Sequence, residues 1–479
     1  MNAVSSSLKD FGDWISPIIV KELRQGMRTK VFTAAFIVLQ GFMVLFILVG
    51  WNQDRTSHSE DASGFFWGCV FITLILVLPL RGFGALSSEV KLDTMDLISL
   101  TRLSAWRITA GKWFALVSQS ILVAIAVMPY VVLRYFFGGV NLFAELLFLG
   151  MALVMSCLLT AIMVGLSAFS NFLIRGILVV AAAAVSLTLI VEFISTSSRM
   201  PNGIPFSDIA GYGYLYLGII LGSLFLMYYF LDMGATRMAP EAINHSTRKR
   251  LISILFLAAL LAMPILFDSL EAEAFYFLGS ALIGLFALDA LTERPSGVRS
   301  LHRPFARGGP VGWLFQLFFS PGWFSGLFYV FVLGGMLFGA ELILDIYGRT
   351  LVANLTLHLS FVGMLVFPVL VIHLFYPDLK SFFSAYFFIQ CAAVAIGTCL
   401  SIIDGTVAIR AIMWAGCPLP FVSYLMAWQD NYDSNGPALL ALSSITLFIT
   451  TLVCLIRGST QIRLWKKFRK EIHDSQNPS

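Results

Sequence analysis

Long apolar runs separated by short polar segments dominate this chain. A helix needs about 20 consecutive apolar residues to cross the hydrocarbon core of a bilayer. Runs of that kind predict twelve spans, at residues 31–51, 64–80, 113–133, 146–169, 176–194, 213–231, 251–267, 275–291, 324–344, 353–375, 382–403 and 437–456. The sequence therefore predicts an all-α, polytopic integral membrane protein with about 12 transmembrane helices.

The polar segments indicate how these spans are grouped. The stretch 232–250 ends in Arg248-Lys249-Arg250, and six predicted spans lie on either side of it. We expect four parts: an interfacial amphipathic region at 1–30, a six-span unit at 31–250, a second six-span unit at 251–456, and a basic cytoplasmic tail at 457–479.

Lys and Arg alternate between the two sides of the predicted membrane. With the N-terminus inside, the inner segments carry 26 of the 31 basic residues and the outer segments carry 5. Positively charged residues concentrate on the cytoplasmic side of membrane proteins. The pattern thus supports the predicted spans and places both termini in the cytoplasm.

Composition agrees with a membrane protein. Hydrophobic residues make up 58% of the chain and charged residues only 12%, whereas soluble domains carry about 25% charged residues. The net charge of +4 is small, so the basic residues indicate orientation and no nucleic-acid partner. The first 30 residues are polar, which argues against a cleavable signal peptide.

Residues 14–30 predict a basic helix lying in the headgroup layer before the first span. Ser16 and Pro17 suit the start of a helix. Apolar residues, including Leu23 and Met27, share one face of that helix. The polar residues that we assign to it are Lys21, Glu22, Arg24 and Arg28. A plain cytosolic extension of the first span is the alternative.

The predicted inner loop at 81–112 is the longest in the first half. Glu89, Asp93 and Asp96 recur at i, i+4 and i+7, so they share one helix face. Apolar residues make a second side. Such a helix suits docking on a cytosolic partner, and a surface helix with solvated charges fits the pattern equally well.

Motifs for covalent or nucleotide chemistry are missing from the sequence. It contains no P-loop, no HExxH, no paired CxxC and no Gly-x-Ser-x-Gly. We therefore expect no enzyme activity, no cofactor and no metal site in this chain. His358 and His373 fall in one predicted span but fifteen residues apart, too far for one metal, and packed or interfacial roles are expected for both.

Ionisable residues within spans mark functional sites by default. Glu192, Asp289 and Glu341 lie near predicted span ends, where a carboxylate can reach the interface. Arg134 is expected to extend to the interface from the outer end of its span. No span centre carries a cluster of charges, which argues against a proton-driven transporter.

Two passages resemble the ABC-2 type permeases, the membrane subunits of one class of ATP-driven exporter. Residues 16–28, Ser-Pro-Ile-Ile-Val-Lys-Glu-Leu-Arg-Gln-Gly-Met-Arg, resemble the family's entry helix on the inner surface. Residues 89–112 are similar to the family's loop between spans two and three, which forms the coupling helix that contacts the ATPase. The matching positions are Glu89, Thr94, Met95, Asp96, Leu97, Leu100, Thr101, Leu103, Ser104, Gly111 and Lys112.

The resemblance implies an export permease that works with a separate cytosolic ATPase in the cytoplasmic (inner) membrane, with permease units pairing as homo- or hetero-dimers. The ATPase-coupling residues would be Glu89, Asp93, Thr94, Asp96, Leu97, Leu100 and Arg102. The family often has Pro where this chain has Arg102, and Leu where it has Met95. Residues 251–479 lack a coupling loop, so the resemblance covers about half the chain. The second half is either a degenerate permease unit or an appended membrane domain.

Two other functions stay open at this point. One is an ATP-independent channel or secondary transporter. The other is an integral-membrane enzyme acting on lipids or glycans. Basic residues at one inner loop suit lipid phosphates, although the positive-inside rule alone accounts for them: Arg294, Arg299, His302, Arg303 and Arg307.

Overall fold

A computed structural model describes residues 17–51, 59–87, 104–137, 142–168, 213–239, 243–267, 272–295, 297–346, 352–376, 382, 385–392 and 436–476. Within these residues all regular secondary structure is helical and no strand occurs. The chain forms two compact units, Met1–Ala239 and Pro240–Ser479. Their boundary falls inside the polar stretch 232–250.

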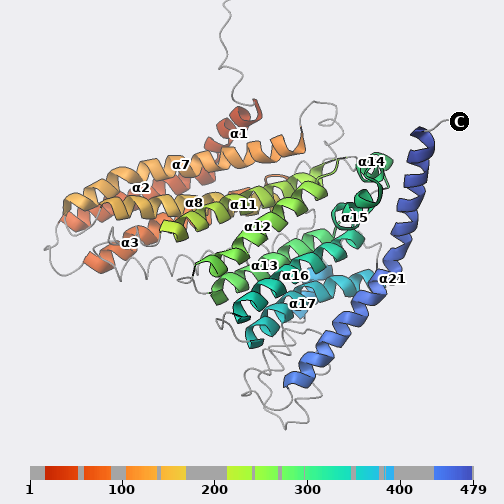
Figure 1. Cartoon of the computed structure of the whole chain (residues 1–479). Helices are drawn as coiled ribbons and strands as arrows, with labels where there is room; N and C mark the ends of the chain where they lie inside the picture. The colour runs from red at the N-terminus through yellow and green to blue at the C-terminus, as the bar shows by residue number, and fades with distance from the viewer. Residues whose placement is uncertain are drawn as a thin grey trace, which may run out of the picture. The chain divides into compact units, whose positions relative to one another are not determined.

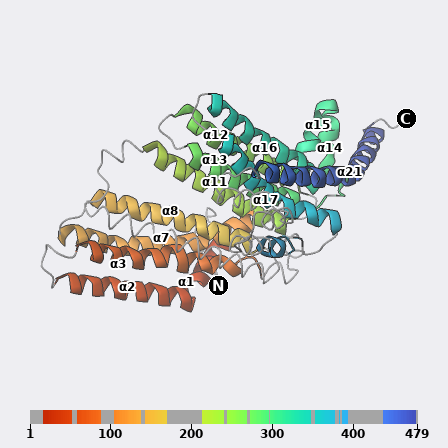
Figure 2. The same ribbon diagram turned by 90° about the horizontal axis from the view of Figure 1, so that it is seen from below.

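Unit 1 is built from helices that run alongside one another (Figures 1 and 2). Its elements are α1 (Pro17–Met27), α2 (Lys30–Trp51), α3 (Ser59–Phe71), the π-helix η1 (Ile72–Val77), α4 (Leu78–Leu80), the 3₁₀ turn η2 (Arg81–Gly84), α7 (Ala105–Phe137), α8 (Leu142–Leu166) and α11 (Gly213–Met238). The helix α8 packs on α7, on α11 and on the segment from η1 to η2.

Aromatic side chains fill the centre of unit 1. The Trp67 ring lies 4.8 Å from the Phe148 ring, edge to face, and stacks on Phe71 at 5.2 Å. Phe66, Val127 and their neighbours complete this buried cluster. It joins α3 to α7 and α8, because each of these helices turns an apolar face toward the same centre.

Unit 2 has its own core (Figure 1). Its elements are α12 (Ser246–Leu266), α13 (Ala272–Leu291), α14 (Arg299–Arg307), α15 (Gly309–Phe319), α16 (Trp323–Ile346), α17 (Val352–Phe375) and α21 (Gly436–Gln476). The helix α13 lies at the centre and packs on α12, α16 and α17. Close approach of α16 to α13 requires Gly326, since a Cβ there would lie 2.6 Å from the Ala290 carbonyl oxygen.

The last helix, α21, joins the predicted twelfth span and most of the predicted tail into one element. It packs on α17 and α16, and further along on α14. Phe324 of α16 contacts it twice: the Trp465 ring lies 5.8 Å away, and Gly458 leaves room for the Phe324 ring. The basic residues after residue 456 therefore belong to a helix that continues beyond the span, and not to a separate tail.

Seven of the described helices are long and apolar enough to cross a membrane. They cover Lys30–Leu48, Gly64–Gly84, Ala105–Phe136, Leu142–Leu166, Ser246–Leu266, Trp323–Ile346 and Leu447–Ile472. Their outward faces are apolar as well: Ile37, Phe136 and Leu255 are each at least 60% exposed. Only lipid solvates such faces favourably, so this is the helix set of a membrane protein.

Most predicted spans coincide with described helices. Shorter apolar helices at Phe275–Leu291 and Phe361–Phe375 lie within two further predicted spans, and α11 contains the predicted span 213–231. The predicted span 176–194 and most of 382–403 lie outside the described residues. The total of twelve spans and the side on which the termini lie therefore stay predictions.

Candidate functional site

Arg81 joins three segments at one end of unit 1. Its Nη2 donates to the Gly26 carbonyl oxygen at 3.1 Å and to Thr29 Oγ1 at 2.7 Å, while Nη1 donates to the Gln119 side chain. Gly26 lies at the end of α1 and Thr29 in the connection between α1 and α2, while Arg81 lies in η2 and Gln119 in α7. Gly26 leaves room for the Gln119 amide, which a Cβ at this position would displace. We call this group the Arg81 junction.

The Arg81 junction joins η2 and α7, the two elements that flank the predicted coupling loop, to the end of α1. The chain leaves η2 shortly after Gly84 and re-enters α7 at Ala105. Two further contacts hold these flanks: Lys112 Nζ donates to the Ala85 carbonyl oxygen at 2.6 Å, and the Leu86 amide donates to Ser167 Oγ at 3.0 Å. The residues just before the loop are therefore held by α7 and by Ser167.

The predicted coupling residues lie at 88–103, outside the described residues. Nothing structural is assigned to Glu89, Asp93, Thr94, Asp96, Leu97, Leu100 or Arg102. The residues predicted for the interfacial helix are described: Lys21, Arg24 and Arg28 are exposed, and Glu22 is half-buried. The chain folds into a helix here, as the amphipathic pattern predicts.

Arg134 does not extend to the membrane interface, so that prediction was wrong. It is only 6% exposed, and its Nη1 lies 2.7 Å from Glu145 Oε2. The guanidinium also lies 4.6 Å from the centre of the Phe66 ring, and Trp67 Nε1 donates to Glu145 Oε1 at 3.4 Å. The short connection between α7 and α8 brings the two charges together, and pairing lowers the cost of their burial.

Glu341 and His358 form a second buried pair, between α16 and α17. His358 Nδ1 lies 2.6 Å from Glu341 Oε1, and both residues are 3% exposed. Tyr276 of α13 donates to the neighbouring Ala340 carbonyl oxygen at 3.4 Å. The expectation that Glu341 reaches the interface was therefore wrong, while His358 is packed as expected.

Two more ion pairs join α12 to the end of α13. Lys249 Nζ lies 2.5 Å from Asp289 Oδ2, and Arg250 Nη2 lies 2.6 Å from Glu293 Oε2. Asp289 is buried against Lys249, contrary to its predicted place at the interface. Glu293 also accepts from the Ser246 hydroxyl at 2.5 Å, so one carboxylate satisfies two donors at the start of α12.

His373 is packed among aromatic rings, as the sequence predicts. Its ring stacks on Trp323 with a centroid distance of 4.5 Å, and Phe382 lies 4.6 Å away. Nε2 lies 2.7 Å from the carbonyl oxygen of Leu291, at the end of α13. The residue therefore ties the end of α17 to the end of α13 and the start of α16.

Sequence reasoning missed the four ion pairs, although the sequence contains a signal for three of them. In the pairs Arg134–Glu145, Glu341–His358 and Lys249–Asp289, the partners lie at similar distances on either side of one connection between consecutive helices. Arg134 and Glu145 flank residues 138–141, and Glu341 and His358 flank residues 347–351. Antiparallel neighbours bring such positions to the same height, so opposite charges placed symmetrically about a loop predict a contact.

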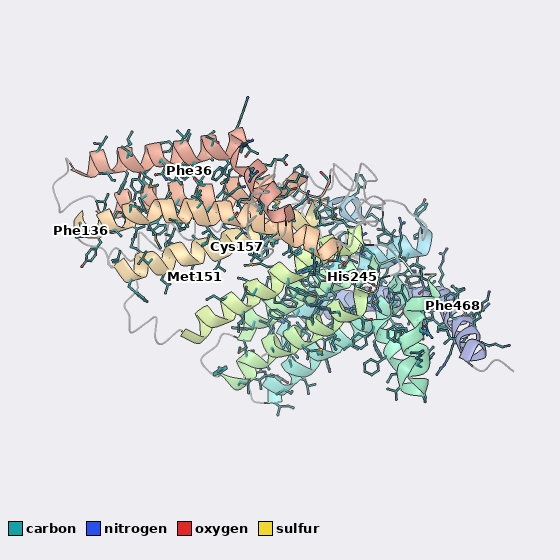
Figure 3. All side chains as sticks on the ribbon, turned by 90° about the horizontal axis from the view of Figure 1, so that it is seen from above. Phe36, Phe136, Met151, Cys157, His245 and Phe468 are labelled. Atoms are coloured by element: carbon teal, nitrogen blue, oxygen red, sulfur yellow. The ribbon has the colours of Figure 1, made fainter. Side chains whose placement is uncertain are left out.

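Figure 3 shows how the side chains of the two units are distributed. Phe36 and Cys157 lie among the packed helices of unit 1, whereas Phe136 points away from the end of α7. Comparisons with protein-family models, with curated proteins and with solved structures found no match to this chain.

Proposed function

We propose that this chain is the permease subunit of an ABC-2 type exporter that works with a separate cytosolic ATPase. The resemblance of residues 16–28 and 89–112 to that family is one support. The observation that carries the proposal is the Arg81 junction, because it links the flanks of the predicted coupling loop to α1. A displacement of the loop would pass through Arg81 to α1, and from there to α2.

The mechanism needs no covalent chemistry in this chain. ATP binding would close the ATPase, and the loop at 88–103 would move with it. Direct hydrogen bonds and close packing transmit such a movement, because packed helices shift as rigid bodies and do not deform continuously. The exposed Lys21, Arg24 and Arg28 would keep α1 at the anionic membrane surface during the movement.

Reversing the charge of the loop tests this proposal. Each surface ion pair contributes only about 0.2–1 kcal/mol, but two reversed charges would also repel a basic partner surface. Asp93→Lys with Asp96→Lys should therefore reduce co-purification of the ATPase and substrate-stimulated ATP hydrolysis, most clearly at low salt. Membrane insertion should be unchanged.

The matched control reverses two exposed carboxylates elsewhere, Glu273→Lys with Asp345→Lys, and should leave ATPase binding intact. Arg81→Leu should retain ATPase binding but lose stimulation of hydrolysis, since it breaks the junction behind the loop and not the docking face. Unchanged binding and stimulation in the loop variant would show that residues 89–102 are not the coupling site.

A proton-coupled secondary transporter is the second candidate, and the buried pair Glu341–His358 favours it. Ionisable groups inside spans commonly carry protons or substrates. Proton movement into vesicles that contain this chain alone, abolished by Glu341→Gln, would place this candidate first. Failure of any ATPase to co-purify with the wild-type chain would point the same way.

A further inference from the structure

The short helices α14 and α15 form a tight hairpin. Their corner is Gly308-Gly309, and a Cβ on Gly308 would lie 2.9 Å from the Cα of Gly312. Gly309 has a φ of +59°, a conformation that favours glycine. Inside the corner, His302 Nδ1 lies 3.2 Å from Gln316 Nε2. The hairpin is thus fixed from its inner side, and His302 is buried and not available to a lipid phosphate.

The end of α15 is held by hydrogen bonds from the start of α12. Arg250 Nη1 donates to the carbonyl oxygens of Phe318 and Ser320 at 2.9 and 3.0 Å. Thr247 Oγ1 donates to the Phe319 carbonyl oxygen at 2.8 Å. Because Thr247 and Arg250 belong to the first turns of α12, the hairpin lies at the ends of the predicted spans.

The basic half of α21 packs against the same hairpin. The Phe468 ring stacks on His302 with a centroid distance of 5.4 Å, and Arg469 Nη2 donates to the Gly309 carbonyl oxygen at 2.7 Å. The part of α21 beyond the span therefore packs beside α14, and the exposed residues of the two helices form one surface. In Figure 1 both short helices lie beside this part of α21.

The exposed side of α15 is apolar, whereas α14 and the end of α21 carry exposed cations. On α15, Val311, Leu314 and Phe315 are 63%, 51% and 50% exposed. On α14 and the extension of α21 the exposed side chains include the cations Arg303, Arg307, Lys466, Lys467 and Lys470, although Leu464 of α21 is exposed as well, at 52%. We call these five cations, with the exposed face of α15, the basic hairpin surface.

The five cations of this surface have no carboxylate within ion-pair distance in the described part of the chain. The buried cations at the same end of unit 2 differ: Lys249 and Arg250 each have a carboxylate partner. The buried cations are thus paired within the protein, whereas the five exposed cations face its surroundings. An apolar face beside cations suits a surface where acyl chains meet anionic headgroups.

We propose that the basic hairpin surface binds the headgroups of anionic phospholipids in the leaflet at this end of unit 2. Val311, Leu314 and Phe315 enter the acyl region, and the cations of α14 and α21 contact the phosphates above them. Each Lys or Arg near an anionic membrane surface raises the affinity of the protein for that surface by about fivefold. This proposal does not depend on the assignment of the chain as a permease.

The test compares lipids with and without net charge. The purified full-length chain in neutral detergent is titrated with phosphatidylglycerol or phosphatidylcholine, and retained lipid is counted by native mass spectrometry. Thermal unfolding is followed in parallel, since a bound ligand raises the midpoint. We expect preferential retention of phosphatidylglycerol. Arg303→Gln with Arg307→Gln should weaken its binding by about 25-fold and leave phosphatidylcholine unaffected.

Controls make the result specific. Lys30→Gln with Arg107→Gln removes two exposed cations from unit 1 and should change phosphatidylglycerol binding little. Lys466→Gln, Lys467→Gln and Lys470→Gln together test the surface from α21, so a folding defect in α14 does not decide the outcome. The proposal is overturned if neither hairpin variant weakens binding, if the unit 1 variant weakens it equally, or if inorganic phosphate raises the midpoint as much as phosphatidylglycerol does.

Discussion

At the scale of single residues, the described charges within or next to the predicted spans, such as Arg134, Asp289 and Glu341, are buried in ion pairs. Glu192 lies outside the described residues. Moving an ion from water into a low-dielectric interior costs several kcal/mol per ion even after relaxation. A partner within hydrogen-bonding distance offsets much of that cost, as Glu145 does for Arg134 at 2.7 Å. The loss of one partner should therefore cost more than the loss of both.

Arg134 and Glu145 offer a direct test of this reasoning. Arg134→Leu leaves a buried carboxylate without its cation and should lower the free energy of unfolding by about 3–5 kcal/mol. Arg134→Leu with Glu145→Leu should recover much of that loss, because no uncompensated charge stays buried. Thermal or denaturant unfolding of the purified chain in detergent measures both variants. A double variant that is less stable than Arg134→Leu would contradict the pairing.

At the scale of helices, small residues set how closely the elements of unit 1 approach. Gly165 of α8 faces α11, where an added Cβ would lie 2.8 Å from the carbonyl carbon of Phe230 and closer still to its oxygen. Gly234 of α11 lies opposite, with its added Cβ 3.0 Å from the Cα of Gly165. Such small-residue contacts are common between membrane helices, since dispersion contacts hold these helices together.

Gly165→Ala should consequently destabilise unit 1. The methyl group meets backbone, which cannot move aside as a side chain can, so we expect a loss of about 1–3 kcal/mol. Gly150 lies in the same helix with nothing within 4 Å of an added Cβ. Gly150→Ala is therefore the matched control and should be neutral or slightly stabilising. Equal unfolding midpoints for the two variants would show that α8 and α11 do not pack as closely as described.

The length of α21 also belongs to this scale. Its 41 residues correspond to about 60 Å at 1.5 Å per residue, about twice the hydrocarbon thickness of a bilayer. One helix therefore serves as a membrane span and as a support outside it. Contacts of Trp465 and Phe468 with α16 and α14 stabilise the outer half.

At the scale of the whole molecule, membrane topology is the property to measure. The predicted orientation rests on the 26-to-5 distribution of basic residues. Cysteines placed at Gln25 and Lys467 should react with a membrane-impermeant thiol reagent only after the membrane is permeabilised. A cysteine at Asp345 should react in intact cells. All three residues are exposed, whereas Ser246 is buried and unsuitable as a probe.

Labelling of the unmodified chain provides the background, because Cys391 is exposed. Reaction of Gln25→Cys in intact cells would show that the orientation of unit 1 is opposite to the predicted one. Reaction of Lys467→Cys would show the same for unit 2. Each unit is thus tested by itself.

The sequence predicted the helical class, the approximate positions of most described spans, the amphipathic α1 and the packed His373. These features depend on local properties: the length of an apolar run, the period of a helix, and the residues that start it. The segment at 89–102, on which the functional assignment depends most, was identified by sequence pattern alone and lies outside the described residues.

Only the tertiary structure decided which residues meet. The pairing of Arg134 with Glu145, the Arg81 junction, the burial of His302 and the basic hairpin surface all join residues on different helices. Hydropathy does not encode the rotation of one helix against the next, which depends on the packing of side chains across the interface. The sequence by itself therefore determined that this chain forms membrane helices, and packing decided which of its charges are buried in pairs and which are left exposed.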